Sequence, residues 1–379
     1  MTIQVFVPKF RTEECLEEIR ECLDKSWTGM GFKTQIFEEK WNEYTGLPHS
    51  HFLNSNTVGL HLAFHLFKAQ CGWKDGDEII TTPLTFISTN HAIAYENLKP
   101  VFADVDETSC LCPKSIEARI TPKTRAVIYV GLGGNTGRLE EVAALCKKHN
   151  LKLILDAAHM SGTRFNGKHV GYESDVTIFS FQAVKNLPTA DSGMICFKDK
   201  FFDEECRKLT WLGINKDTYA RTTKQGNYKW KYDVESVGFK YHGNSIMASL
   251  GLVALKYLDE DNQYRRKLAK EYKAHLSAIP GIKFVEEIEG CESAQHLFQI
   301  RVQNRDDLMT YLQENDIFPG VHYRDNTEYR PYAYGAGTCP KAHQISEEVI
   351  SLPLHLKLES KDIAHISEVV RQFFIKNSQ

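Results

Sequence analysis

The sequence predicts an α/β protein, in which a large domain with a mainly parallel mixed sheet covered by helices precedes a smaller α+β domain. Between residues 50 and 200, apolar runs of strand length show little alternation and are separated by amphipathic segments, a pattern typical of a parallel sheet buried on both faces. Beyond residue 245, a long helical segment leads to shorter strands and helices. We therefore expect a large domain at residues 1–245 and a small domain at 246–379, and the N-terminal segment is a candidate to pack on the small domain.

Strands and helices alternate along the large domain. The expected strands are the apolar runs at residues 77–83, 100–105, 125–131, 151–159, 176–181 and 193–197. The expected helices lie at residues 54–67, 88–98 and 138–150. The carboxyl ends of parallel strands form the edge at which open α/β sheets bind ligands, so residues that follow these runs are the first candidates for a site.

The second part of the chain differs in composition and in hydrophobic pattern. Residues 215–242 are polar, aromatic and basic. Residues 244–279 read as one long helix, with apolar side chains at helical spacing, and this helix is expected to link the two domains. The segments 296–302, 306–316 and 361–376 are expected to build the small α+β domain.

Composition excludes several classes of protein. The 379 residues carry a formal net charge of −3, which provides no general attraction for nucleic acid or an anionic membrane. The longest apolar runs have strand length, far short of the roughly 20 residues that span a bilayer, and no signal peptide is expected. Ten cysteines occur without a C-x-x-C motif, and the pair Cys110 and Cys112 has no matching second pair, so we expect reduced thiols, no metal site and a cytoplasmic protein.

The segment YVGLGGNTG at residues 129–137 resembles a dinucleotide-binding turn, since it follows a strand and precedes a helix. A G-x-G-x-x-G motif that starts at Gly131 requires glycine at position 136, where Thr136 stands. This motif is the basis of a rival hypothesis, a nicotinamide-dependent dehydrogenase, and the misplaced glycine counts against it.

Two other segments suggest functions that the sequence does not support. Residues 162–169 almost match a P-loop, but His169 replaces the hydroxyl residue, and a hairpin turn at Asn166-Gly167 explains them better. The basic and aromatic residues at 221–242 resemble a nucleic-acid patch. In a net-acidic chain we expect this loop to meet a small phosphorylated ligand or solvent.

Two residues at strand ends indicate a specific chemistry. Asp156 lies in the run 151–159, and Lys185 follows the run 176–181. Taken singly, Asp156 would equally well cap a helix, and Lys185 would be an ordinary exposed lysine. Together they match pyridoxal 5'-phosphate (PLP), which needs an amine of lowered pKa to form a Schiff base and a carboxylate to keep its ring nitrogen protonated.

Nearby residues meet the other needs of this cofactor. Backbone N–H groups at a helix N-terminus bind phosphate, and Ser55, Asn56 and Thr57 head an apolar helix. Ser180 would add a hydroxyl group, and Phe86 would supply an apolar face for the ring.

These segments, in this order, resemble the DegT-type PLP-dependent sugar aminotransferases, which have the aspartate aminotransferase fold (PLP fold type I). The resemblance extends over most of the chain. The segments that carry it are SWTGMG (26–31), NSNTVGLHLA (54–63), GDEIITTPLTFISTNHAI (76–93), KPVFADVDETS (99–109), LILDAAHMSGTRFNGKHVG (153–171), FSFQAVKNLPTADSGMI (179–195), GVHYRDN (320–326) and CPKAHQISEEVISLPLH (339–355). It implies a PLP-dependent transaminase.

The resemblance also implies roles for individual residues. Lys185 would form the internal aldimine with the cofactor and move the proton in the 1,3-shift, while Asp156 would pair with the pyridine nitrogen. His159 would lie near the ring hydroxyl, and Phe86 would stack on the ring.

Further implied roles concern the phosphate and the partner subunit. The turn Ser55–Thr57 and Ser180 would hold the phosphate. Lys240 stands where many members have an asparagine that reaches the phosphate of the neighbouring subunit, which implies a homodimer with shared active sites.

Two positions depart from the family pattern. Asn56 replaces the usual glycine of the phosphate loop, and residues 129–134 lack a histidine that the family often has there. A related branch has histidine in place of the lysine and performs 3-dehydration, so Lys185 argues against that reaction.

The implied reaction transfers an amino group from an amino acid, expected to be L-glutamate, to a keto sugar, expected to be a nucleotide-linked 3- or 4-keto-6-deoxy sugar. The basic residues that would meet the diphosphate, unless they only face solvent, are Arg221, Lys229, Lys231 and Arg324. The residues that would line the sugar pocket are Trp27, Thr28, His322 and Tyr323, although His322 would equally well be a packed histidine. The alternatives are a free keto-cyclitol or small phosphorylated ketone as acceptor, the dehydrogenase, and a non-catalytic PLP-binding protein.

Overall fold

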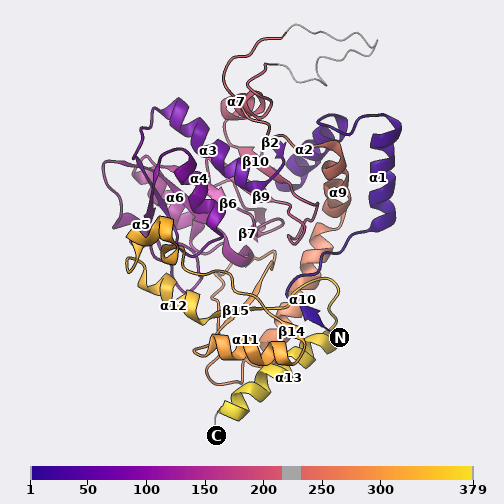
Figure 1. The fold of residues 1–379 in the computed structure, drawn as a ribbon, viewed down its shortest axis with the longest axis vertical. Coiled ribbons are helices and arrows are strands. Elements are labelled where there is room, and N and C mark those ends of the chain that lie inside the picture. The colour runs from indigo at the N-terminus through magenta and orange to yellow at the C-terminus, as the bar shows by residue number, and fades with distance from the viewer. Residues whose placement is uncertain (1, 216–231, 378–379) are drawn as a thin grey trace.

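The computed structural model describes residues 2–215 and 232–377, and a seven-stranded sheet forms its centre (Figure 1). The strand order is β2-β10-β9-β6-β5-β3-β4, and β10 is antiparallel to both of its neighbours while the other pairs are parallel. The strands are β2 (His49–Leu53), β3 (Glu78–Thr81), β4 (Lys99–Phe102), β5 (Thr124–Val130), β6 (Lys152–Asp156), β9 (Val176–Ser180) and β10 (Gly193–Phe197). The predicted α/β class with a mainly parallel mixed sheet is confirmed.

Helices cover both faces of this sheet. Successive side chains of a strand point to opposite faces, and here both sets are apolar and pack against helices. In β5, Ala126 and Ile128 face one apolar core, whereas Val127 and Tyr129 face the other. The helices of the first core are α3 (Asn56–Cys71), α4 (Ile87–Tyr95) and α7 (Lys200–Thr210). Those of the second core include α2 (Phe32–Thr45), α6 (Leu139–Lys148) and α9 (Ser245–Lys256), and α1 (Thr12–Asp24) packs outside α9. Burial on both faces explains why the strand sequences are continuously apolar.

The small domain has its own apolar core around a three-stranded antiparallel sheet. Its strands are β11 (Lys283–Phe284), β13 (Phe298–Arg301) and β15 (Val349–Leu352). Its helices are α10 (Leu258–Leu276), α11 (Arg305–Glu314) and α13 (Ser360–Asn377). The N-terminal strand β1 (Ile3–Gln4) pairs in parallel with β14 (Ile317–Phe318), and both chain ends lie at this end of the molecule in Figure 1.

The segment expected to be one linking helix forms two helices, α9 and α10, which meet at Tyr257. The backbone of Tyr257 has φ −113° and ψ 3°, outside the helical range. Ala248 and Leu252 of α9 lie in the core of the large domain, whereas Leu268 and Tyr272 of α10 lie in the core of the small domain. Apolar periodicity did not reveal this change, because both halves carry it while facing different cores.

Shorter elements connect these layers. The strands β7 (Arg164–Phe165) and β8 (Lys168–His169) form a hairpin whose turn is Asn166-Gly167, both with positive φ, as expected for this dipeptide. The strand β12 (Cys291–Glu292) joins β7. The remaining elements are α5 (Pro113–Glu117), η1 (Leu132–Gly134), η2 (Asn326–Glu328), η3 (Arg330–Gly335) and α12 (Pro340–Glu348).

In the part of the chain that the structure describes, neither a bilayer-spanning helix nor a disulfide contributes to this architecture. Among residues 2–215 and 232–377, each helix is too short or too polar to cross a membrane. All ten cysteines lie in these ranges, and all are free thiols.

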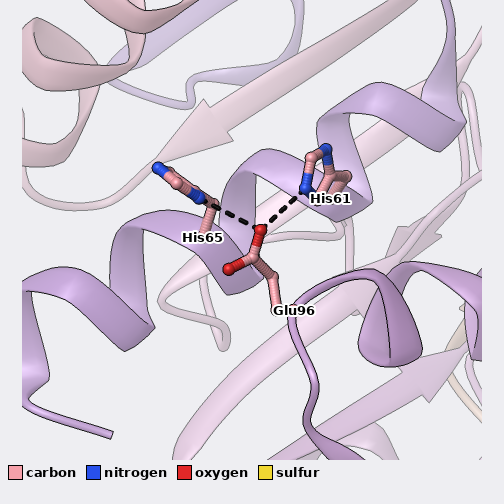
Figure 2. Close-up of side chains that lie close together, drawn as sticks. All are labelled: His61, His65 and Glu96. Atoms are coloured by element: carbon pink, nitrogen blue, oxygen red, sulfur yellow. Dashed lines mark hydrogen bonds and ion pairs between the residues drawn. The ribbon is translucent and has the colours of Figure 1, made fainter. Parts of the chain in front are cut away.

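A carboxylate from the end of α4 connects that helix to α3 (Figure 2). The ring nitrogens His61 Nε2 and His65 Nδ1 on α3 both donate to Glu96 Oε1, at 2.8 and 3.0 Å. Residues four apart lie on the same face of a helix, which is why one oxygen receives both bonds. The two helices are thereby fixed to each other beyond the first turn of α3 and at the end of α4.

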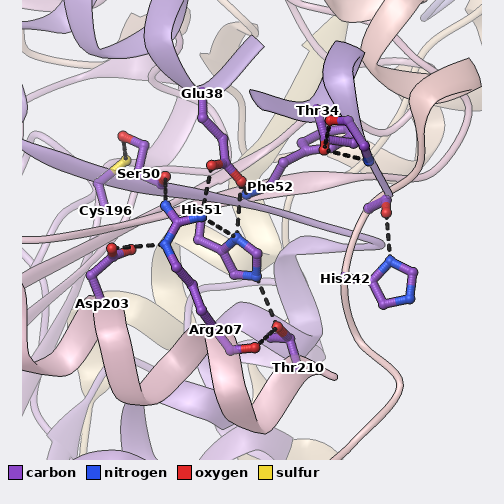
Figure 3. A network of polar contacts seen from close by, with 12 residues as sticks. Thr34, Glu38, Ser50, His51, Phe52, Cys196, Asp203, Arg207, Thr210 and His242 are labelled. Atoms are coloured by element: carbon purple, nitrogen blue, oxygen red, sulfur yellow. Dashed lines mark hydrogen bonds and ion pairs between the residues drawn. The ribbon is translucent and has the colours of Figure 1, made fainter. Parts of the chain in front are cut away.

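A buried ionic network joins α2, β2 and α7 (Figure 3). Glu38 accepts from His51 Nδ1 at 2.9 Å, from the Phe52 backbone N–H at 2.8 Å and from Arg207 Nη1 at 2.8 Å. Arg207 also donates to Asp203 at 2.8 Å. Burial by itself would raise the pKa of Glu38, but the charges of Arg207 and His51 and the hydrogen bonds outweigh it and lower this pKa to about 2.

We expect Glu38→Gln to lower the free energy of unfolding by about 3 kcal/mol at pH 7, because it breaks a buried pair and leaves Arg207 short of a counter-charge. Because the pKa of Glu38 is lowered in the folded protein, its stabilisation is complete above its ordinary pKa of 4.5 and is lost as the pH falls toward 2. The difference between wild type and variant in denaturant unfolding should therefore shrink between pH 5 and about 2.

The matched control is Glu17→Gln, since Glu17 is 79% exposed and pairs only with exposed Arg20 in the described part of the chain. This change should leave the unfolding midpoint almost unaltered. Equal effects of the two substitutions would contradict a structural role for the Glu38 network.

Candidate active site

A cavity of about 420 Å³ opens at the carboxyl ends of the central strands. Asp156 is the last residue of β6 and Ser180 the last residue of β9, and these strands are parallel neighbours. Lys185 lies in the loop between β9 and β10 and also lines the cavity. Parallel pairing therefore brings the carboxylate and the amine to one edge of the sheet, where open α/β sheets bind ligands.

Asp156 is buried and receives hydrogen bonds from three directions. Thr89 Oγ1 donates to Oδ2 at 2.8 Å, while the Ala158 N–H at 3.2 Å and Asn56 Nδ2 at 3.4 Å donate to Oδ1. Burial raises the pKa of Asp156, and these donors together with the charge of Lys185 act against that rise. They stabilise the ionised carboxylate in a place where water does not.

Lys185 is held by the segment around it. Its backbone N–H donates to the Gln182 carbonyl at 2.8 Å. The next residue, Asn186, is buried and donates to Asn262 Oδ1 at 2.7 Å and to the Ala294 carbonyl at 2.6 Å. Burial lowers the pKa of the Lys185 amine to about 8, although the charge of Asp156 opposes this, so the neutral, nucleophilic form is far more populated near neutral pH than in an exposed lysine.

The N-terminus of α3 forms another wall of the cavity. Ser55 is its N-cap, and its Oγ accepts from the Val58 N–H at 3.3 Å. Asn56 and Thr57 follow at the start of the helix, where backbone N–H groups and the helix dipole favour an anion. Gly193 of β10 permits this packing, because a Cβ there would lie 2.7 Å from the Asn56 nitrogen.

The glycine-rich segment after β5 supports His159 and does not have the form of a dinucleotide-binding loop. Gly133, with φ 68°, donates its N–H to His159 Nδ1 at 3.1 Å. His159 Nε2 lies 3.2 Å from the Tyr323 hydroxyl. Burial, reinforced by the charge of Lys185, lowers the pKa of His159 well below its ordinary value, so the ring is neutral and carries its proton on Nε2.

The small domain and the N-terminus contribute residues that the sequence did not indicate. His296 lies against His159, with ring centroids 4.3 Å apart, and its Nδ1 donates to Asn186 Oδ1 at 2.9 Å. Phe6 stacks on His296 at 5.3 Å. Thr89, Gln182, Asp191 and Ser192 were also missed, although each belongs to a segment that carries the family resemblance.

The structure gathers most of the predicted site residues in this one cavity. Those that line it are Ser55, Asn56, Thr57, Phe86, Asp156, His159, Ser180, Lys185, His322 and Tyr323. Phe86 is 58% exposed and its ring lies 5.9 Å from that of Tyr323. Burial lowers the pKa of His322 to about 4, so this ring is also neutral.

Four other predicted residues lie outside the lining of the cavity. Lys240 places its Nζ 3.1 Å from the centre of the Trp211 ring, and Arg324 pairs with Glu328 at the surface. Trp27 donates its Nε1 to the Met30 carbonyl at 2.8 Å, and the Thr28 carbonyl accepts from the Ser245 N–H at 3.1 Å. Arg221, Lys229 and Lys231 lie outside the described residues.

Comparison with known proteins places this geometry in a family. Residues 10–371 match the DegT/DnrJ/EryC1/StrS aminotransferase family. The spore coat polysaccharide biosynthesis protein SpsC of Bacillus subtilis is 33% identical over 372 residues, covering 95% of this chain and 94% of its own.

Two solved structures share the fold across their length. PseC of Helicobacter pylori, an aminotransferase involved in the biosynthesis of pseudoaminic acid, has a TM-score of 0.91 and 26% identity, covering 99% of this chain and all of its own. Spr1654 of Streptococcus pneumoniae, described as a putative sugar aminotransferase, has a TM-score of 0.90 and 26% identity, covering 99% of each chain. Spr1654 is known in PLP and PMP forms.

The residues of the cavity fit this cofactor. A lysine amine of lowered pKa, a buried carboxylate with three donors and the N-terminus of α3 supply a partner for the aldehyde, the ring nitrogen and the phosphate. The rival hypotheses of a dehydrogenase and of a non-catalytic protein are wrong. The chain belongs to the DegT/DnrJ/EryC1/StrS aminotransferase family and is a PLP-dependent transaminase.

Proposed function

We propose that this enzyme transfers an amino group from L-glutamate to a keto sugar that is linked to a nucleoside diphosphate, expected to be a 3- or 4-keto-6-deoxy sugar. The observation that carries the proposal is the joint placement of Lys185, Asp156 and the N-terminus of α3 in one cavity of a chain similar to PseC and SpsC. When bound, PLP supplies the electron sink for breaking the bond to hydrogen at the amino-bearing carbon. The reduced cysteines and the phosphorylated substrate make the cytoplasm the proposed compartment.

Lys185 is the proposed acid and base. Its amine has a pKa of about 8, because the cavity excludes water, and it can therefore take up and return a proton near neutral pH. Asn186 supports this role by fixing the loop to α10 and to the small domain. During the 1,3-shift, Lys185 would hold the proton after it leaves one carbon atom and before it reaches the other.

Asp156 is proposed to hold the ring nitrogen in its protonated form. This requires an ionised carboxylate, although burial favours the neutral acid. Thr89, Ala158 and Asn56 counter that tendency by donating hydrogen bonds. His159 and Tyr323 would orient the opposite side of the ring, with His159 neutral and its tautomer set by Gly133.

The phosphate is proposed to bind at Ser55, Asn56 and Thr57, with Ser180 as an additional donor. Phe86 would cover the ring. For the acceptor, His322 and Tyr323 line the same cavity, whereas Trp27, Thr28, Lys229 and Arg324 are proposed contacts on the basis of the family resemblance alone.

A homodimer with shared active sites is the proposed assembly. Lys240 lies outside the lining of its own cavity, and burial against Trp211 lowers the pKa of its amine. In the proposed dimer this lysine would leave the Trp211 ring and reach the cavity of a partner related by a twofold axis.

The reaction class is tested by absorption spectroscopy of the PLP-loaded protein. L-Glutamate should bleach the visible band of the cofactor, and a keto-sugar nucleotide should restore it, whereas Lys185→Ala should show neither change. A panel that includes free keto-cyclitols and small phosphorylated ketones identifies the acceptor. Restoration by one of those ketones, and not by any sugar nucleotide, would overturn the proposed acceptor but leave the transaminase intact.

Thr89→Val should weaken PLP binding by about 10- to 100-fold, because one strong hydrogen bond to a buried carboxylate is worth about 1.5–3 kcal/mol. The measurement is the dissociation constant from fluorescence quenching of the cofactor-free protein. Thr82→Val is the control, since Thr82 is buried on the same segment and bonds only to the Leu84 N–H among the described contacts of its hydroxyl. Equal affinities of wild type and Thr89→Val would remove Thr89 from the support of Asp156.

Co-expression of Lys185→Ala and Lys240→Ala chains with different tags tests the shared sites. Lys240→Ala alone should bind PLP weakly, but a hybrid dimer contains one site with both lysines intact. Purified hybrids should therefore recover tight PLP binding in a fraction of their sites, measured by cofactor absorbance after gel filtration. A monomeric elution volume, or hybrids without recovery, would contradict shared sites.

A further inference from the structure

Three metal-ligating side chains gather outside the active site, between α3 and the end of α4. His61 and His65 lie four residues apart on α3 and point to Glu96, which follows the last residue of α4 (Figure 2). One ligand atom from each, His61 Nε2, His65 Nδ1 and Glu96 Oε1, lies within 4.8 Å of the other two. In the described part of the chain this is the one such group of three.

We propose that His61, His65 and Glu96 bind a divalent transition-metal ion, with Zn²⁺ as the best chemical match. Two imidazole nitrogens and one carboxylate oxygen form a ligand set that Zn²⁺ takes in proteins, with water completing a tetrahedron. Neither Ca²⁺ nor Mg²⁺ fits well, since both prefer sites made of oxygen ligands.

The spacing of the ligand atoms suits such an ion after a small adjustment. The two nitrogens lie 2.8 and 3.0 Å from the carboxylate oxygen. Tetrahedral ligands about 2.0 Å from zinc lie about 3.3 Å apart, so each contact needs to open by a few tenths of an ångström. We expect rotation about the side-chain bonds to supply this opening and to bring the two nitrogens, which lie within 4.8 Å of each other, to the same spacing.

A hydrogen-bond partner outside the ligand set is also in place for one of the histidines. His61 Nδ1 lies 3.4 Å from the Tyr241 hydroxyl. When Nε2 binds the ion, the ring proton moves to Nδ1 and is donated to the Tyr241 oxygen, the kind of outer contact that orients metal-bound histidines.

The surroundings hold the ligands in place and still admit an ion. The side chains of His61 and Glu96 are 11% and 13% exposed, whereas that of His65 is 30% exposed and leaves an entry path. Lys68 donates to the Glu96 carbonyl at 2.6 Å and fixes the backbone that carries the carboxylate. Ligands on regular, restrained elements lose little freedom on binding.

The consequence of the ion would be structural. Both α3 and α4 begin at the active-site cavity, with Ser55 and Phe86 as their N-cap residues. An ion between His61, His65 and Glu96 would link the two helices beyond those ends and hold the cofactor-binding turns in register. The site stands apart from Lys185 and takes no part in the amino transfer.

The test is zinc binding to the PLP-loaded protein, measured by equilibrium dialysis with metal analysis and by the shift of the thermal midpoint on adding Zn²⁺. Wild type should bind one more Zn²⁺ per chain than His65→Gln or Glu96→Gln, and only wild type should show the higher midpoint. Glu96→Gln keeps an oxygen that accepts both histidine bonds, so its fold should be retained.

The matched control is His343→Gln, because His343 also faces two carboxylates, Asp325 and Glu328, but is 54% exposed and has no second histidine beside it. Its zinc binding should equal that of wild type. Exposed Cys71, at the end of α3, is a competing thiol, so each protein is measured again with Cys71→Ser.

Cobalt supplies a second readout, since tetrahedral Co²⁺ with nitrogen and oxygen ligands absorbs at longer wavelengths than PLP. Wild type and His343→Gln should develop this band, whereas Glu96→Gln should lose it. Equal metal content and equal spectra of wild type and Glu96→Gln would overturn the proposal and leave the cluster as a hydrogen-bonded link. Bleaching by L-glutamate, which depends on Lys185, would be unaffected by either result.

Discussion

The burial of one carboxylate, Asp156, is the constraint on which the site depends. A carboxyl group removed from water tends to become neutral, and only donors directed at its oxygens keep it charged. Those donors are Thr89 of α4, Asn56 at the start of α3, and the backbone N–H of Ala158, two residues after β6. The position of both helices relative to the sheet is therefore part of the chemistry.

Burial lowers the pKa values of the basic groups in the cavity, and at Lys185 the charge of Asp156 only partly offsets this effect. Lys185, His159, His296 and His322 all have lowered pKa values for which burial is the largest cause. In a cavity with neutral imidazoles and a partly neutral amine, Asp156 is the buried carboxylate, whereas Asp191, which also lines the cavity, is exposed. The α3 N-terminus provides a separate place for an anion, so in the proposed site a phosphorylated pyridinium would meet opposite partners for its two charges.

Connections far from the cavity hold this arrangement together. The Glu38 network ties α2, β2 and α7 on one side, and Glu96 ties α4 to α3 on the other. Asn186 and Gly133 connect the large domain to the small domain. Asn186 bonds to Asn262 and to His296, and the Gly133 carbonyl accepts from the His296 backbone N–H at 3.0 Å. Precise placement of reacting groups requires such support from restrained neighbours.

The sequence by itself determined the α/β class, the strand runs, the family and the pairing of Lys185 with Asp156, because these depend on local periodicity and on motifs contiguous in the chain. It also indicated the hairpin at Asn166-Gly167, whose backbone preference is local. Only the tertiary structure decided the break at Tyr257, the use of the glycine turn to hold His159, and the meeting of Phe6 and His296 at the cavity. These features depend on contacts between segments that are distant in sequence. The packing of the layers sets the geometry of such contacts, and neither segment carries a periodic pattern that would predict them.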